Sequence, residues 1–105
     1  MNFSINHKIF DYIISSPNCF SYNNFTFLYR YCNNNAFLGF ILPKHLGAAC
    51  KRNLFKRRCR ALFRDVNKER TVINLGLIIK TNSIDIDYQD VCGGFSALLH
   101  KLESK

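Results

Sequence analysis

Residues 46–64 read Leu46-Gly-Ala-Ala-Cys-Lys-Arg-Asn-Leu-Phe-Lys-Arg-Arg-Cys-Arg-Ala-Leu-Phe-Arg64 and predict one long amphipathic helix. On a helical wheel that advances about 100° per residue, the apolar side chains gather in one stripe. The members of this stripe are Phe55, Cys59, Leu62, Phe63 and Val66. A stripe of this kind must be buried, so the helix is expected to pack on the rest of a globular domain and to end near Arg64 in a polar connection.

The same wheel places cations and one amide on a single flank beside the stripe. They are Arg52, Asn53, Lys56, Arg57, Arg60 and Arg64. Residues 44–64 contain no Asp or Glu, and like charges four residues apart repel by a few tenths of a kcal/mol. A face that served only solubility would alternate its signs. The flank therefore indicates an anionic partner, with phosphate favoured over two alternatives: a merely solvated face, or a face that docks on a membrane or a protein.

The residues before this helix predict a short helix and a β-hairpin. Apolar residues have helical spacing within residues 6–15, and Ser16-Pro17 ends that segment. Residues 25–32 place four aromatic side chains on one face of a strand, and residues 37–42 are a second apolar run after Asn33-Asn34-Asn35. The two runs are expected to pair as a hairpin. A further short strand is compatible with residues 19–22.

The residues after the basic helix predict one more strand and one more helix. Residues 71–80 are densely apolar, which suits a central strand. Asp87 is the expected N-cap of a helix that runs through Leu102, in which Gly93 and Gly94 each weaken the helix by roughly 1 kcal/mol. The expected fold is α+β, a single mixed β-sheet with three helices in one domain, residues 1–105.

Composition narrows the class of protein. The chain has 105 residues, a formal net charge of +8 and five cysteines. The cysteines are odd in number and include no Cys-x-x-Cys pair, which predicts buried, reduced thiols and a cytoplasmic location. No leader-like start and no apolar run of about 18 residues is seen, so no membrane partner is expected. The three histidines and seven acids share no spacing typical of a metal site or an acid-base pair, so no catalytic residue and no small-molecule substrate is expected.

The segment Phe37-Leu-Gly-Phe-Ile-Leu-Pro-Lys-His-Leu-Gly-Ala-Ala-Cys-Lys-Arg-Asn-Leu-Phe-Lys-Arg-Arg-Cys-Arg-Ala-Leu-Phe-Arg64 resembles the signature of the bacterial ribonuclease P protein subunit. In that family a strand that carries a Gly leads through a Gly-containing turn into a helix with an Arg-Asn-Arg core. The positions that match in register are Gly39, Lys44, Gly47, Ala49, Arg52, Asn53, Lys56, Arg57, Arg60 and Phe63. Residues 9–13 and 74–80 resemble the family's first helix and last strand.

The resemblance implies a ribosomal S5 domain 2-like fold with a left-handed crossover around the basic helix, against the usual hand. It implies the protein subunit of an endoribonuclease ribonucleoprotein, in which a catalytic RNA removes the 5′ leader from precursor tRNA. In such a complex the partner RNA holds Mg²⁺, and the protein itself binds no cofactor. The resemblance places contacts to that RNA on Arg52, Asn53, Lys56, Arg57 and Arg60, and it places Phe10 in a cleft for the single-stranded leader. Arg64 on the same flank and Lys44 just before the helix complete the expected RNA-binding set, although the composition alone leaves Lys44 open between an RNA backbone and solvent. Side chains of residues 25–31 would join Phe10, without the sequence deciding which.

Four positions depart from the family's pattern. Leu54 stands where the core motif usually has its second Arg, Pro43 and His45 replace parts of a Ser-Lys-Lys segment, and Asn74 takes the place of a common Asp. One RNA contact is expected to be lost at Leu54. A ribosomal or other structured-RNA-binding protein of the same fold, with no part in cleavage, is the alternative.

Overall fold

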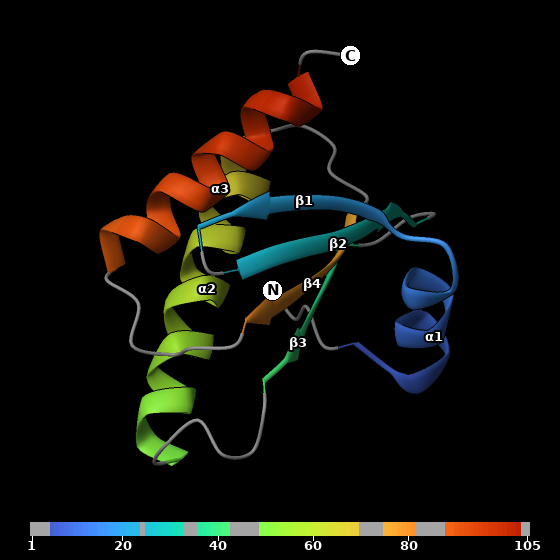
Figure 1. The fold of residues 1–105 in the computed structure, drawn as a ribbon, viewed down its shortest axis with the longest axis horizontal. Helices are drawn as coiled ribbons and strands as arrows, with labels where there is room; N and C mark the ends of the chain where they lie inside the picture. Colours follow the sequence, from blue (N-terminus) through green and yellow to red (C-terminus); the bar gives the residue numbers. More distant parts are fainter. Residues whose placement is uncertain are drawn as a thin grey trace.

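The sheet is organised around β4, Leu75–Thr81, which pairs with β2 on one side and β3 on the other. The structure is a computed structural model and describes residues 5–23, 25–32, 36–42, 49–69, 75–81 and 88–103. Over these residues the strand order is β1-β2-β4-β3 (Figure 1), where β1 is Asn18–Tyr22, β2 is Phe25–Tyr31 and β3 is Phe37–Ile41. β2 runs antiparallel to both of its neighbours, β1 and β4, and β3 runs parallel to β4. The prediction of a mixed sheet with a central apolar strand is confirmed.

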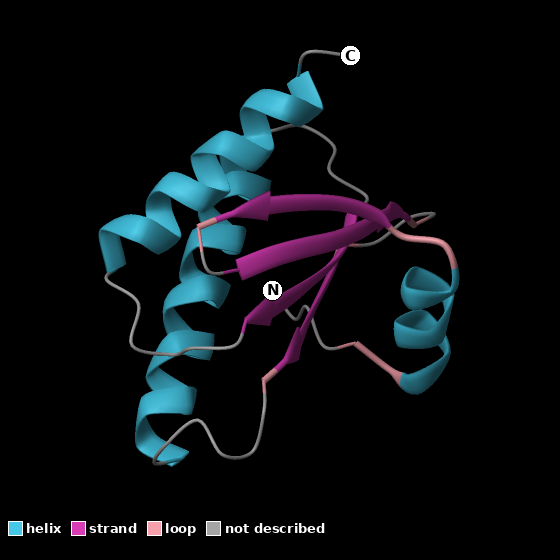
Figure 2. Ribbon diagram, viewed as in Figure 1, coloured by secondary structure: helices cyan, strands magenta, loops and turns pink. Residues whose placement is uncertain are grey.

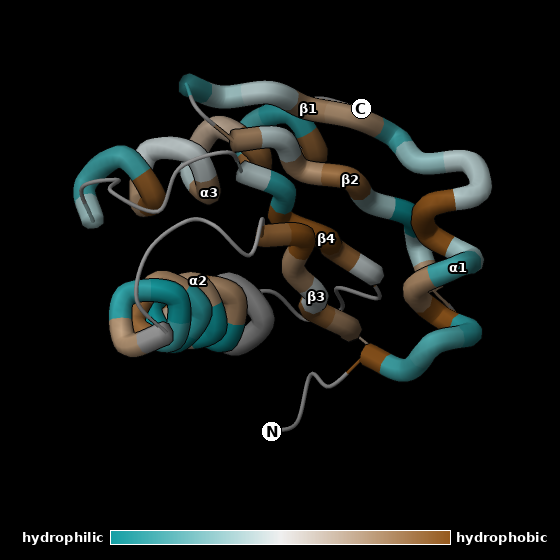
Figure 3. Tube along the Cα trace, turned by 60° about the horizontal axis from the view of Figure 1, so that its bottom comes forward, coloured by the Kyte–Doolittle hydropathy of each residue, from teal (hydrophilic) through white to brown (hydrophobic). Residues whose placement is uncertain are grey.

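Three helices flank this sheet in the described part of the chain, as the sequence predicted: α1, His7–Ser15; α2, Ala49–Glu69; and α3, Tyr88–Glu103. α2 and α3 lie together on one face, and α1 lies on the other (Figures 2 and 3). The Asn6 side chain caps α1 because its Oδ1 accepts a hydrogen bond of 2.9 Å from the Ile9 amide. Among the helices described, none is long and apolar enough to cross a bilayer. Asp87, the expected cap of α3, lies outside the described residues.

The predicted hairpin between residues 25–32 and 37–42 is wrong. β4 lies between these two strands, with Leu77 opposite Tyr29 of β2 on one side and opposite Leu38 of β3 on the other. Residues 75–79 are all buried, and a strand that is apolar on both faces is most stable at the centre of a sheet whose two faces are covered by helices. β3 therefore pairs with β4, which it reaches through α2, and the hand of this crossover stays a prediction.

The hairpin that does form joins β1 and β2, so the short strand around residues 19–22 is confirmed. Its register places Tyr22 opposite Phe25, with two residues between them. Asn23 has a φ of 51°, in the left-handed region that Asn tolerates better than other residues with a Cβ. Asn23 therefore suits the first position of this two-residue turn, for which Asn is strongly preferred.

α2 is longer at its C-terminal end than the sequence predicted. Residues 65–69 were expected to form a polar connection, but they are helical to Glu69. No Gly or Pro interrupts them, and none of their residue types costs more than about 0.7 kcal/mol relative to Ala in a helix. The expected start at Leu46 lies outside the described residues, which resume at Ala49.

The main core lies between the sheet and the α2–α3 pair. It joins the aromatic face of β2 and the apolar residues of β4 to one side of each helix (Figure 3). The helix residues in it are Phe55, Cys59, Phe63, Val91, Phe95 and Leu98. Gly94 allows α3 to approach closely, since a Cβ there would overlap the Phe25 ring. The two α3 glycines, expected only to weaken that helix, therefore also permit its packing.

The opposite face of the sheet receives α1. A Cβ on Gly76 of β4 would lie 2.7 Å from Ile13 Cδ1 and 2.8 Å from Cys32 Sγ. Ile5, just before α1, fills the space over Gly39 of β3 in the same way, with its Cγ2 3.1 Å from a Cβ built there. α1 is thus anchored through two glycines on neighbouring strands.

Candidate nucleic-acid interface

α2 separates its apolar and charged side chains as the wheel predicted. Phe55, Cys59 and Phe63 are buried in the core. On the neighbouring flank Asn53, Arg57, Arg60 and Arg64 are exposed, and Arg52 and Lys56 are half-buried. We call Arg52, Asn53, Lys56, Arg57, Arg60 and Arg64 the basic flank. The structure brings these predicted residues together on one helix, whereas Lys44, Pro43, His45 and Asn74 lie outside the described residues.

Two cation–π contacts fix the direction of the basic flank. The Arg60 guanidinium lies 5.9 Å from the centroid of the Phe40 ring on β3, and that ring packs edge-on against Phe55. Arg58 turns the other way, with its guanidinium 5.4 Å from the ring centroid of Tyr88 on α3. The basic flank therefore opens along the β3 edge of the sheet, and Arg58 is separated from it.

The charge on this flank is not neutralised by carboxylates in the described part of the chain. The contact between His7 Nε2 and Asp11 Oδ2, at 3.3 Å, lies on α1, away from α2. Leu54, the departure from the family's motif, is half-buried. Its partial burial explains how an apolar residue is accommodated there. The concentrated positive potential is what a phosphate backbone requires.

The face that carries α1 also presents side chains beside that helix. Residues alternate along β2, so Phe25, Phe27 and Tyr29 are buried under α2 and α3 while Thr26 and Leu28 face the α1 side. Lys80 of β4 is opposite Thr26 and shares its face. Ser21 is the β1 neighbour of Thr26, and their hydroxyl oxygens are 3.3 Å apart.

We call Ser21, Thr26, Leu28 and Lys80 the open strip. Ser21 and Lys80 are exposed, and Thr26 and Leu28 are half-buried. Phe10, on α1, is also half-buried. The aromatic residues of β2 are committed to the core, with the exception of Tyr31 at the strand's end, so the side chains that β2 offers beside α1 are aliphatic and polar. The alternation of residue types along residues 25–31 already indicated that the aromatic side chains share one face of the strand and the other side chains share the opposite face.

The cysteines differ in exposure more than the sequence predicted. Cys32 and Cys59 are buried, as expected, but Cys19 and Cys50 are exposed and Cys92 is half-buried. Burial raises the pKa of the Cys59 thiol to about 12, with the nearby Arg60 charge acting in the opposite direction. Burial likewise raises the pKa of Cys32. Among the described residues no three His, Cys, Asp or Glu side chains are placed to hold a metal ion.

Comparison with known proteins gives a consistent result. The sequence model of the family described as Ribonuclease P matches residues 5–103. The Ribonuclease P protein component of Syntrophus aciditrophicus (strain SB) is 39% identical over 66 residues, which are 61% of this chain and 55% of that relative. The matched region thus spans about half the length of this curated relative.

Solved structures show the same fold. The RNase P protein of Staphylococcus aureus superposes with a TM-score of 0.77 at 18% identity, over 97% of this chain and 96% of that one. The RNase P protein of Thermotoga maritima gives a TM-score of 0.75 at 21% identity, over 93% of this chain and 96% of that one. The family match covers almost the whole chain, including α2 with its basic flank. This chain therefore belongs to the bacterial ribonuclease P protein family.

Proposed function

We propose that the chain is the protein subunit of a ribonuclease P ribonucleoprotein, which removes the 5′ leader from precursor tRNA in the cytoplasm. The observation that carries the proposal is the basic flank: a row of cations from Arg52 to Arg64 with no Asp or Glu between them, displayed by a helix that lies within the family match. The cleavage is assigned to a catalytic RNA, which holds the Mg²⁺ ions. The protein contributes binding and positioning, and residues 1–105 act as one RNA-binding domain.

The basic flank is assigned to the catalytic RNA. Arg52, Lys56, Arg57, Arg60 and Arg64 supply charge to phosphates, and Arg guanidinium groups can donate two hydrogen bonds to one phosphate. Asn53 lies among them and is exposed, so its amide can donate to a phosphate and accept from a 2′-hydroxyl. Lys44 extends this contact set on the basis of the family's motif alone.

The single-stranded leader is assigned to the α1 side of the sheet. Phe10 offers an aromatic ring for base stacking, Lys80 offers a cation, and the hydroxyls of Ser21 and Thr26 offer hydrogen bonds. A strand bound there would meet a surface built from α1, β1, β2 and β4. The leader and the catalytic RNA would thus occupy different sides of the sheet and meet across the β3 edge.

Reconstitution tests the proposal directly. The protein is added to a bacterial ribonuclease P RNA at low Mg²⁺, and cleavage of a precursor tRNA is measured with and without it. We expect the protein to stimulate cleavage at the correct 5′ position. About five phosphate contacts predict a log-log salt slope of roughly −4 for binding to that RNA. No stimulation, together with copurification of ribosomal RNA, would favour the alternative RNA-binding role.

A further inference from the structure

α1 depends on the sheet for its position. It has nine residues, and helices this short are marginal without tertiary contacts. Within α1, Ile13 is buried and most of the other side chains are exposed. The position of Phe10 over the sheet is therefore set by the few groups that hold α1 down.

Arg30 of β2 is one of these groups, and it acts at the C-terminal end of α1. Its Nη1 donates to the Tyr12 carbonyl oxygen at 3.0 Å and to Ser15 Oγ at 3.4 Å. Ser15 Oγ donates to the same Tyr12 carbonyl at 2.9 Å. The last turn of α1 contains no basic residue of its own. Arg30 thus supplies the cation that the negative end of the helix dipole favours, and it supplies it from the sheet.

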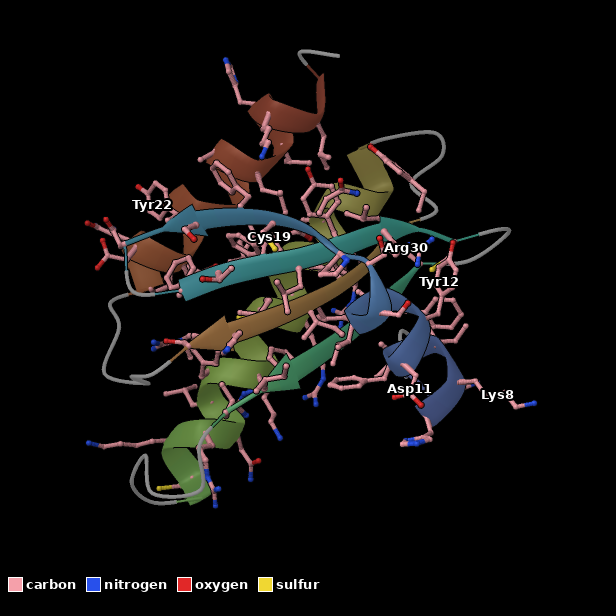
Figure 4. The ribbon with its side chains drawn as sticks, turned by 45° about the vertical axis from the view of Figure 1, so that its right-hand side comes forward. Lys8, Asp11, Tyr12, Cys19, Tyr22 and Arg30 are labelled. Atoms are coloured by element: carbon pink, nitrogen blue, oxygen red, sulfur yellow. The ribbon has the colours of Figure 1, made fainter. Side chains whose placement is uncertain are left out.

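The Tyr12 side chain completes the contact. The Arg30 guanidinium lies 3.9 Å from the centroid of the Tyr12 ring, and the Tyr12 hydroxyl donates to the Tyr31 carbonyl oxygen at 3.5 Å. Figure 4 shows Arg30 beside Tyr12 where α1 meets β2, while Lys8 and Asp11 project from the helix away from this contact. Hydrogen bonds and ring stacking therefore hold one guanidinium in one orientation, which makes the contact directional.

We propose that Arg30 is a positioning residue for the leader: it holds the C-terminal end of α1 on the sheet and thereby fixes Phe10 relative to the open strip. The inference rests on the proposed leader site and adds to it a residue on β2 that need not touch RNA. Phe10 lies two residues before Tyr12 on the same short helix, so freeing the C-terminal end of α1 is expected to shift Phe10. The space above Gly76 holds the Ile13 side chain, but α1 can still rotate about that contact.

Substrate binding by the reconstituted ribonucleoprotein tests this role. Affinity is measured for precursor tRNA with a leader and for mature tRNA without one. We expect Arg30→Met to raise the Kd for the leader-bearing substrate about tenfold, with little change in affinity for mature tRNA or for the catalytic RNA. Arg30→Lys keeps the charge but lacks the planar guanidinium, so its Kd for the leader-bearing substrate should lie between those of the unchanged protein and Arg30→Met. Tyr12→Leu keeps the carbonyl contact but loses the ring, and should have a smaller effect.

Lys8→Met is the matched control, because Lys8 is an exposed cation on α1. An equal effect of Lys8→Met and Arg30→Met would show that only charge matters and would overturn the inference. Hydrogen exchange supplies a readout that does not involve RNA: Arg30→Met should speed exchange of the α1 amides while α2 amides keep their protection. Should Arg30→Met not fold, Arg30→Lys and Tyr12→Leu carry the same two measurements.

Phe10→Ala separates the two proposals. A loss of leader affinity in Phe10→Ala but not in Arg30→Met would overturn the positioning role and leave the leader site standing. No loss in Phe10→Ala would overturn the leader site, and unchanged α1 exchange in Arg30→Met would overturn the anchoring role on its own.

Discussion

Ile13 of α1 occupies the space that a side chain on Gly76 of β4 would need, with its Cδ1 2.7 Å from a Cβ built on that glycine. Gly76→Ala should therefore destabilise the protein by about 1–3 kcal/mol through overpacking. Urea unfolding followed by circular dichroism measures this loss. Gly39→Ala is the control, because the nearest atoms there belong to the Ile5 side chain at 3.1 and 3.3 Å and can shift. Equal losses in the two variants would contradict the tighter fit at Gly76.

At Gly94 of α3, helix propensity and core packing have opposite effects on the stability of an Ala substitution. In an exposed helix, Gly→Ala stabilises by about 1 kcal/mol, but a Cβ at Gly94 would overlap the Phe25 ring in the core. We expect Gly94→Ala to lower the free energy of unfolding by about 1 kcal/mol or more. Gly93→Ala would meet mainly the hydroxyl end of half-buried Tyr22 and should be better tolerated. A Gly94→Ala variant with a raised midpoint of unfolding would show that α3 can move away from the sheet.

Arg60 and Arg58 form a matched pair on α2. Replacing either residue by Ala removes one guanidinium. Arg60 faces β3 with the basic flank, whereas Arg58 faces Tyr88. Arg60→Ala should weaken binding to the catalytic RNA about tenfold and reduce the magnitude of the salt slope by about 1. Arg58→Ala should change that affinity by about twofold or less. Filter binding across a salt series measures both, and equal losses would indicate a diffuse electrostatic contact.

Thiol labelling should distinguish the cysteines by their burial. Cys59 is fully buried and burial raises its pKa to about 12, so it stays a neutral thiol at pH 8. In the native protein an alkylating reagent should modify exposed Cys50 and Cys19 first and leave Cys59 intact until unfolding, as peptide mapping would show. Rapid native labelling of Cys59 would mean that α2 separates readily from the core.

The same shift predicts a pH dependence of stability. The unfolded Cys59 thiol ionises near its ordinary pKa of 9.0, whereas the folded thiol stays protonated until about 12. Between these values the unfolded state binds fewer protons, so the free energy of unfolding contributed by this group falls as pH rises. Replacing Cys59 by Ala should flatten the fall between pH 9 and 11, measured by urea unfolding. An unchanged slope in the variant would contradict this assignment.

Sequence patterns predicted the parts of the structure that are local. The spacing of Phe55, Cys59 and Phe63 identified the buried side of α2, because helical periodicity depends only on neighbours along the chain. The pairing of β3 with β4 was missed, since adjacent strands with a short connection usually form a hairpin and no local signal opposes it. The contact between Arg30 and Tyr12 joins residues 18 apart and depends on how α1 lies on the sheet. Periodicity carries no information on that placement.

The central position of β4 has a consequence for how the chain folds. Its partners on β2 are 44 to 56 residues earlier in the sequence, from Tyr31 with Leu75 to Phe25 with Thr81. During synthesis β1, β2 and β3 emerge before the strand that joins β2 to β3, and loop closure over such separations is slow compared with local helix formation. Until residues 75–81 leave the ribosome, β2 has one free edge and β3 lacks its partner. The nascent chain is then most open to misassociation, and β4 completes the sheet.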